Sequence, residues 1–323
     1  MPSLRARGLA AALACVPLLA LAPGGAGAAP FAFVTNQGAD TVSVIDLATN
    51  AVVDTVAVSG APAGVAADPR RGLVFVTSPD THQLSAIDAD SHGVEAQTTA
   101  GQGPLGVAVD SVGGRVYVAD WHGDEVRVFD AMTLAERGRY KVGRAPSGIA
   151  LSADGRLLLV ANRDDDEVQA ISTGDGLTLG RIGVGKAPFG VTISSDGARA
   201  FVANVQSAEI TVIDLRGLQP SLTLPVGHMP YAIAHDPRRE RLFVTNQEDS
   251  TVSVLDLAER QEITRIEVGD YPEGIAFSAR LRRVYVANWF SNSITVIDAD
   301  SLAVLDTIAT GDGSRAFGNF ILE

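Results

Sequence analysis

The feature that most restricts the fold is a short segment that recurs seven times at a constant spacing of 42 residues. Its copies are FVTN (33–36), FVTS (75–78), YVAD (117–120), LVAN (159–162), FVAN (201–204), FVTN (243–246) and YVAN (285–288). An aspartate follows each copy by ten residues, except in the fourth repeat, where Ser172 takes its place. Seven repeats use 294 of the 295 residues after residue 28, so we expect a single domain over residues 29–323.

Each repeat contains four short strand-like runs separated by Gly, Pro, Asp and Asn turns. In the last full repeat the runs cover residues 273–278, 283–287, 293–298 and 303–309. Four-stranded units with a period of about 40–45 residues are typical of β-propellers. The sequence therefore predicts an all-β fold, a seven-bladed β-propeller with four-stranded antiparallel blades.

The chain enters the predicted ring partway through a blade. Residues 31–36 match the second strand of a repeat, whereas residues 314–322 match an innermost strand. We expect the C-terminal strand to join the N-terminal strands and close the ring, which removes exposed sheet edges. Small residues recur on the innermost strands, as at Gly106, Gly148 and Gly190, and are expected where the blades converge.

These repeats resemble those of the YVTN β-propeller family, which includes YncE-like exported proteins. The resemblance covers residues 31–323 and rests on the seven FVTN or YVAN segments, the TVSVID or SITVID strands and a VGxxPxG motif. The sequence departs from the pattern at Ser172 and at Ser314, which replaces the proline of the seventh repeat. The resemblance implies an exported, seven-bladed protein. It implies no particular chemistry, because propellers host many unrelated functions.

Residues 1–28 are predicted to be a secretory signal peptide. Arg5 and Arg7 precede an apolar stretch over residues 8–22, and Ala26-Gly27-Ala28 is a small-residue cleavage pattern. We expect a periplasmic or extracellular protein without a transmembrane segment after cleavage. Cys15, the one cysteine, lies inside this segment, so the mature chain has no disulfide. A lipid anchor at Cys15 is disfavoured, because residues 16–22 remain apolar where a mature surface would begin.

Composition and motifs exclude several classes of function. A formal net charge of −13 argues against general nucleic-acid binding, which depends on Lys and Arg at phosphates. The mature chain lacks cysteine, a G-x-S-x-G elbow and an H-E-x-x-H motif, so catalysis finds little support. We expect no cofactor, and the sequence favours a non-enzymatic protein while leaving an enzyme open as an alternative.

Loop positions that vary between repeats indicate where a partner would bind. Loops between second and third strands, and loops between blades, are expected on one face around the channel mouth. Both tryptophans fall in one such loop position, and aromatic residues beside mixed charges are typical of a binding surface. The alternative is that these aromatic side chains pack over neighbouring blades. The candidate binding residues are Trp121, His122, Arg163, Lys186, His228, Tyr231, Tyr271, Trp289 and Phe290.

Two weaker hypotheses concern metals and acid chemistry. His122, His228 and Met229 are weak metal candidates, since no two histidines have short ligand spacing. Acidic residues that would serve a propeller hydrolase are Asp120, Asp164, Glu248 and Glu273.

The leading hypothesis is an exported, monomeric, non-enzymatic binding or scaffold protein. Its partner would be an unidentified protein or small molecule of the cell envelope. One alternative is a propeller enzyme or redox accessory, such as a lactonase-like hydrolase or a helper of a periplasmic quinone or haem system. The other is a cell-surface structural module.

Overall fold

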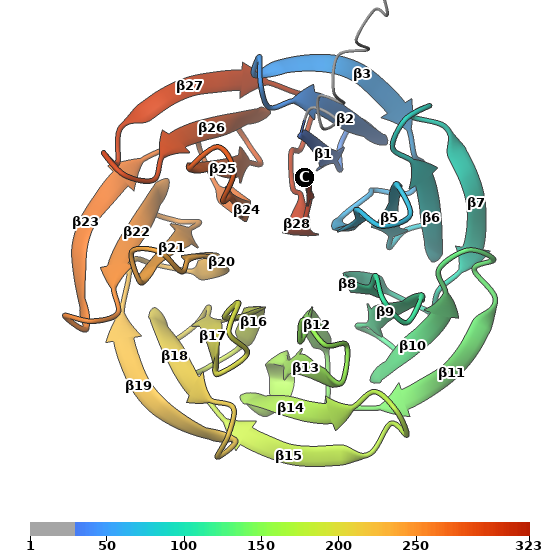
Figure 1. Ribbon diagram of the computed structural model, residues 1–323, viewed down its shortest axis with the longest axis horizontal. Helices are drawn as coiled ribbons and strands as arrows, with labels where there is room; N and C mark the ends of the chain where they lie inside the picture. Colours follow the sequence, from blue (N-terminus) through green and yellow to red (C-terminus); the bar gives the residue numbers. More distant parts are fainter. Residues whose placement is uncertain (1–29) are drawn as a thin grey trace, which may run out of the picture.

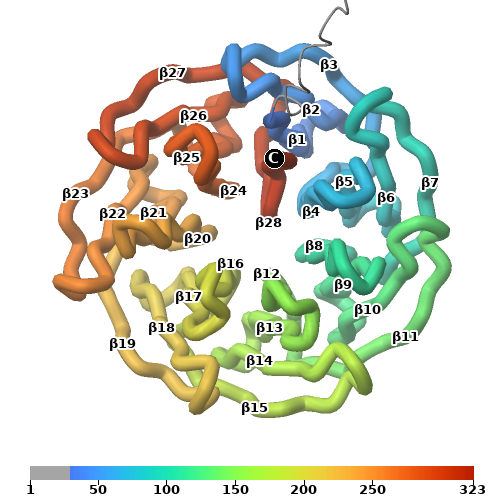
Figure 2. Tube along the Cα trace, viewed as in Figure 1, coloured from blue at the N-terminus to red at the C-terminus, as the bar shows by residue number. Residues whose placement is uncertain are grey.

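Each 42-residue repeat folds into antiparallel β-strands joined by tight turns. The computed structural model describes residues 30–323, and seven sheets stand around a central axis as blades of a closed ring (Figure 1). Figure 2 shows the first and last blades side by side. The predicted seven-bladed β-propeller is confirmed. The signal peptide predicted for residues 1–28 lies outside the described residues, so it and the domain boundary at residue 29 stay predictions.

Strands are lettered A to D from the axis outward. Blade 1 contains β29 (Ile321–Leu322), β1 (Phe31–Asn36), β2 (Thr41–Asp46) and β3 (Ala51–Ala57). Blade 2 contains β4 (Gly64–Asp68), β5 (Leu73–Ser78), β6 (Gln83–Asp88) and β7 (Val94–Thr99). Blade 3 contains β8 (Pro104–Asp110), β9 (Arg115–Asp120), β10 (Glu125–Asp130) and β11 (Glu136–Lys141). Blade 4 contains β12 (Pro146–Leu151), β13 (Leu157–Asn162), β14 (Glu167–Ser172) and β15 (Thr178–Gly183), with a 3₁₀ turn, η1 (Arg163–Asp165), between β13 and β14.

The other three blades have the same plan. Blade 5 contains β16 (Pro188–Ile193), β17 (Arg199–Asn204), β18 (Glu209–Asp214) and β19 (Gln219–Pro225). Blade 6 contains β20 (Pro230–Asp236), β21 (Arg241–Asn246), β22 (Thr251–Asp256) and β23 (Gln261–Glu267). Blade 7 contains β24 (Pro272–Ser278), β25 (Arg283–Asn288), β26 (Ser293–Asp298) and β27 (Val304–Ala309). Each bound in blade 7 lies within one residue of its predicted position. Over residues 30–323, no helix has the length and apolar character needed to cross a bilayer.

The hydrophobic core lies between the blades. The third residue of each strand B is large and fully buried, and packs against a neighbouring sheet. These residues are Phe33, Phe75, Tyr117, Leu159, Phe201, Phe243 and Tyr285. The strands D are mostly exposed, as in β7 and β11, so the apolar surface is concentrated on the inner three strands.

Glycine on the inner strands is required by close approach of the blades. A Cβ atom at Gly148 would lie 2.3 Å from the carbonyl oxygen of Phe189 on the next blade. At Gly190 the corresponding distance to Tyr231 is 2.4 Å. A larger residue would force the blades apart, and this explains the small-residue column of the sequence.

The C-terminal segment closes the ring, with one difference from the prediction. Ser314 forms a bridge with Asn36, and β29 pairs with β1, as predicted. The residues between them leave blade 1 instead, and β28 (Phe317–Asn319) pairs in parallel with β4 of blade 2. Positive φ angles of 48° at Ala316 and 126° at Gly318 let the chain make this detour.

Candidate functional site

Two sets of loops lie on one face of the ring, here called the BC face. The backbone N–H of Trp289, in the loop between strands B and C, donates to the carbonyl of Tyr271, in the loop entering the blade, over 3.0 Å. The same bond joins Trp121 to Gly103 over 2.9 Å. The loops between strands B and C and the loops entering the blades therefore lie together on this face. The loops between strands A and B define the opposite, AB face.

Three aromatic side chains of blade 7 gather on the BC face and are called the rim patch: Tyr271, Trp289 and Phe290. The rings of Trp289 and Phe290 stack with centroids 5.1 Å apart and planes 11° apart. Tyr271 contacts both, with centroid distances of 5.7 and 5.0 Å. Phe290 remains 66% exposed, which is unusual for so large an apolar side chain.

The rim patch is bordered by acidic groups. A groove of about 300 Å³ runs beside Trp289 and Phe290 and is also lined by Asp312 and Gln37. Asp270 and Glu248 are exposed in neighbouring loops, and the charge of Glu248 contributes to the raised pKa of Tyr271, after burial of that ring. The patch therefore offers flat aromatic faces beside carboxylates. This combination favours a cation, which is attracted by both.

Trp121 belongs to a different cluster on the same face. Its ring contacts Phe189 at 6.0 Å, and Phe189 contacts Tyr231 and Phe317 at 4.2 and 5.0 Å. Together these side chains form an aromatic layer across the channel mouth. Tyr231 is only 5% exposed, so the residue predicted on the accessible rim is packed inside, as the alternative interpretation had it. The guanidinium of Arg163 covers Trp121 at 5.7 Å.

A buried polar network lies beside the aromatic layer. Nε of Arg315 is 2.9 Å from Oε2 of Glu273, and Gln247 donates a 3.0 Å hydrogen bond to Oε1 of the same carboxylate. Arg315 also donates to the Tyr231 hydroxyl over 2.5 Å and to Gln37 over 3.2 Å. Burial raises the pKa of Glu273, and the charge of Arg315 opposes that rise. Burial likewise raises the pKa of Tyr231, so the phenol stays protonated. The network joins blades 1, 6 and 7.

The remaining predicted residues are dispersed over the BC face. Lys186 is exposed and paired with Asp166, and Nδ1 of His228 lies 2.8 Å from Asp249. Each of these two side chains is therefore engaged with a carboxylate of a neighbouring loop between strands B and C. His122 is exposed, and its ring lies against the backbone of Gly103.

The weak metal candidates are not brought together as a ligand set. Met229 packs against the apolar cluster under the channel mouth, away from the exposed His122 and His228. Within residues 30–323, no three His, Cys, Asp or Glu side chains are grouped so as to hold a metal ion.

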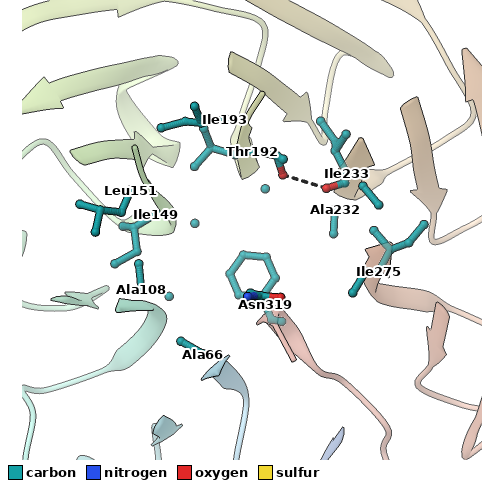
Figure 3. A pocket seen from close by; sticks show the side chains of 18 of the residues that line it. Ala66, Ala108, Ile149, Leu151, Thr192, Ile193, Ala232, Ile233, Ile275 and Asn319 are labelled. Carbon is teal, nitrogen blue, oxygen red and sulfur yellow. Dashed lines mark hydrogen bonds between the residues drawn. The ribbon is translucent and has the colours of Figure 1, made fainter. Parts of the chain in front are cut away.

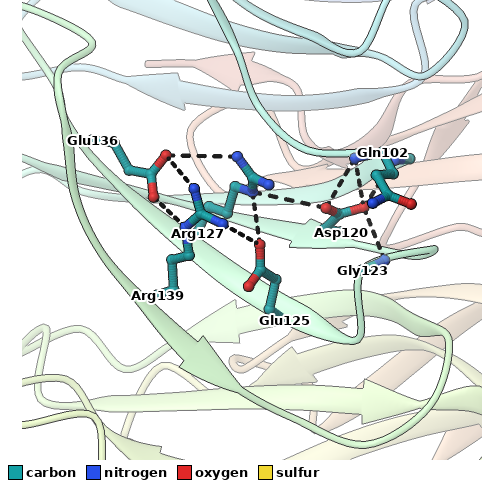
Figure 4. Close-up of polar contacts among 8 residues, drawn as sticks. Gln102, Asp120, Gly123, Glu125, Arg127, Glu136 and Arg139 are labelled. Atoms are coloured by element: carbon teal, nitrogen blue, oxygen red, sulfur yellow. Dashed lines mark hydrogen bonds and ion pairs between the residues drawn. The ribbon is translucent and has the colours of Figure 1, made fainter.

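Asp120, one of the acidic candidates, holds loops in place. Its carboxylate accepts hydrogen bonds from the backbone N–H groups of Gln102, Gly103 and Gly123 over 2.8–3.2 Å (Figure 4). Arg127 lies 3.7 Å away and pairs also with Glu125. The side chain is fully buried, so this carboxylate supports the loops of blade 3.

Five other blades carry asparagine where blade 3 has Asp120. In blade 6, Asn246 donates to Thr251 and Ser253 of the next strand over 3.0 and 2.9 Å. In blade 3 the residues at the corresponding positions are Glu125 and Arg127. The carboxylate of Asp120 therefore lies beside the guanidinium of Arg127.

Comparisons with known proteins agree with the architecture. The family model described as YNCE-like beta-propeller matches residues 20–115, and the NHL repeat model matches residues 102–129. No curated protein matches the chain.

Three solved structures with this fold have 17–20% sequence identity to the chain. Hydrazine synthase of Kuenenia stuttgartiensis superposes with a TM-score of 0.71 at 20% identity, covering 78% of this chain and 87% of that chain. Dihydro-heme d1 dehydrogenase NirN in complex with DHE gives 0.69 at 17% identity, covering 88% and 74%. A functionally unknown protein from Desulfotomaculum acetoxidans gives 0.77 at 17% identity, covering 90% and 99%. Such identities show the fold alone.

The family-model match over residues 20–115 and the seven-bladed ring together support a YncE-like β-propeller family for this chain.

Proposed function

We propose that the protein is an exported, non-enzymatic binding propeller that captures a basic segment of a partner protein on the rim patch. The observation that carries the proposal is the stack of the half-buried Trp289 on the exposed Phe290, beside the carboxylates of Asp270 and Asp312. Large aromatic side chains are the residues that most often dominate binding energy at protein interfaces. The family resemblance and the N-terminal sequence support a periplasmic or extracellular location.

The chemistry of the patch selects the class of partner. A lysine or arginine side chain lying over an indole face gains cation–π attraction, and nearby carboxylates add Coulomb attraction. Arg315, the cation whose charge reaches Tyr271, already pairs with Glu273, and Lys186 pairs with Asp166. The exposed carboxylates of Glu248, Asp270 and Asp312 therefore leave the patch acidic. A partner segment rich in lysine or arginine is therefore complementary to this surface.

Calorimetric titration of the mature protein with a hexalysine peptide tests the proposal. We expect saturable binding that weakens at least about tenfold in the double variant Trp289→Ala, Phe290→Ser, because both aromatic faces are removed. The variant keeps every charge, so nonspecific attraction of the peptide to an acidic protein is unchanged.

The matched control is Met132→Ser. Met132 is also 66% exposed, but it follows strand C of blade 3, away from the BC face. Binding should be unchanged in this control. Equal affinity in wild type and the double aromatic variant would contradict the proposal.

A further inference from the structure

A cavity of about 550 Å³ occupies the central channel, apart from the rim patch (Figure 3). It is lined by one apolar residue from most inner strands: Val107, Ile149, Val191, Ile233, Ile275 and Phe317. A second apolar set follows toward the AB face and includes Leu151 and Ile193. Volume and lining are in the range of small-molecule binding sites.

The two ends of the cavity are bordered by different groups. Toward the BC end the lining includes Phe317, whose ring contacts those of Phe189 and Tyr231. At the AB end, the lining includes Pro69 and Pro237, both of which are exposed. A ligand would therefore enter from the AB face and keep one end at that mouth.

The charged groups at the mouth are set by one repeat position. Pro69 and Pro237 occupy the same position of the repeat. The residues that directly follow this position in the seven repeats are Arg70, Val112, Asp154, Asp196, Arg238, Arg280 and Leu322. The carboxylates of Asp154 and Asp196 already accept hydrogen bonds within their own turns, from Ser152 and Ser194 among others.

Two arginines at this position have no charged partner among the residues that the structure describes. The side chains of Arg70 and Arg238 are exposed, and among residues 30–323 neither forms an ion pair. Their neighbours behave differently, since Arg71 pairs with Asp68, and Arg239 pairs with Asp300. Hydrogen bonds from Ser152 and Ser194 lower the pKa of Asp154 and Asp196, so both stay charged. The repeat position therefore has three arginines against two carboxylates, a cationic excess in a chain that is acidic as a whole.

We propose that the channel binds an amphipathic monocarboxylate, with its apolar body in the cavity and its carboxylate at Arg70 and Arg238. Burial of the apolar body supplies most of the affinity, and the guanidinium groups select an anionic head. Asn319 lies among the cavity side chains in Figure 3, where its exposed amide adds a hydrogen-bonding group to the wall. This site is independent of the rim patch.

Calorimetry with dodecanoate tests the site, with dodecanol and dodecyltrimethylammonium as probes of the head group. We expect one dodecanoate to bind per protein, and the cationic analogue to bind at least about tenfold more weakly. The variant Arg70→Glu, Arg238→Glu should weaken dodecanoate binding at least about tenfold and reduce this preference. Equal or tighter binding of the cationic analogue by the wild type would overturn the proposal.

Two matched controls separate the site from general effects. Arg216→Glu with Arg260→Glu changes the net charge equally at exposed loops after strands C, and should leave affinity unchanged. Asn319→Trp should block the cavity, whereas Asn319→Leu keeps the side chain near its present size and should still bind. Thermal melting establishes that each variant is folded. Undiminished dodecanoate binding by folded Asn319→Trp would place the ligand elsewhere and overturn the proposal.

Discussion

Nε of Arg315 lies 2.9 Å from Oε2 of Glu273, and this ion pair joins the C-terminal segment to blade 7 beneath the loops of the BC face. The two side chains are 15% and 4% exposed. A pair so far from water depends on both of its members, because a single buried charge keeps its desolvation penalty without the compensating attraction.

Removing one member of this pair is predicted to destabilise the fold strongly. Arg315→Met should lower the free energy of unfolding by about 3–5 kcal/mol at neutral pH, because Glu273 is then buried without a cation. The double variant Arg315→Met, Glu273→Gln should recover much of that loss. Urea denaturation of both variants measures the difference. A double variant as unstable as the single would show that the pair is not what holds these blades.

The loss in Arg315→Met should also depend on pH. Burial already raises the pKa of Glu273 above its ordinary 4.5, and removing Arg315 raises it further. The folded state then binds more protons than the unfolded state between pH 4.5 and the raised value, so stability falls as pH rises through that window. Urea denaturation of this variant near pH 4.5 and about pH 8 should show the smaller loss at the acidic end.

Deleting residues 314–323 is predicted to open the ring. The deletion removes β28, β29, the fully buried Phe320 and the partners of β1 and β4, which leaves two unpaired strand edges. We expect a sharp fall in the melting temperature by circular dichroism, together with self-association in sedimentation experiments, because exposed edges pair between molecules. An unchanged melting curve would contradict a closure that depends on this segment.

Arg127, on β10, is predicted to need a carboxylate rather than an amide at position 120. Asp120→Asn should destabilise the protein by about 1–3 kcal/mol, because an amide N–H would face the Arg127 guanidinium, which can only donate. Adding Glu125→Thr and Arg127→Ser reproduces the arrangement of Asn246, and should restore most of the loss. Chemical denaturation of the single and triple variants checks this, and failure of the triple variant to recover would refute the interpretation.

The fold could be predicted closely from the sequence because the same pattern of four strands recurs in seven repeats. A strand bound misplaced in one repeat is corrected by six others, which is why the bounds of blade 7 were predicted within one residue. The path of residues 317–319 could not be predicted, because it depends on the positive φ angles of Ala316 and Gly318, at a place where the repeat pattern is broken.

Alignment of the repeats grouped Trp121 and His122 with Trp289 and Phe290, because they share loop positions, but these pairs follow β9 of blade 3 and β25 of blade 7. The contact of Tyr271 with Trp289 and Phe290 is a feature of blade 7 that the structure shows. Tyr231 was expected on the rim but is buried, because Phe189 and Phe317 reach it from blades 5 and 1. Contacts across the channel depend both on the size of each side chain and on how the ring closes. An alignment of the repeats shows neither which blades face one another nor which side chains meet.

Fluorescence of Trp289 tests the central claim, capture of a basic segment by the rim patch, most directly. The chain has two tryptophans, so in the variant Trp121→Phe all indole emission comes from Trp289. Titration with hexalysine should shift or quench this emission saturably, while a neutral hexaglycine peptide should have no effect. Emission that stays unchanged while calorimetry records peptide binding would contradict the assignment of the rim patch as the binding surface.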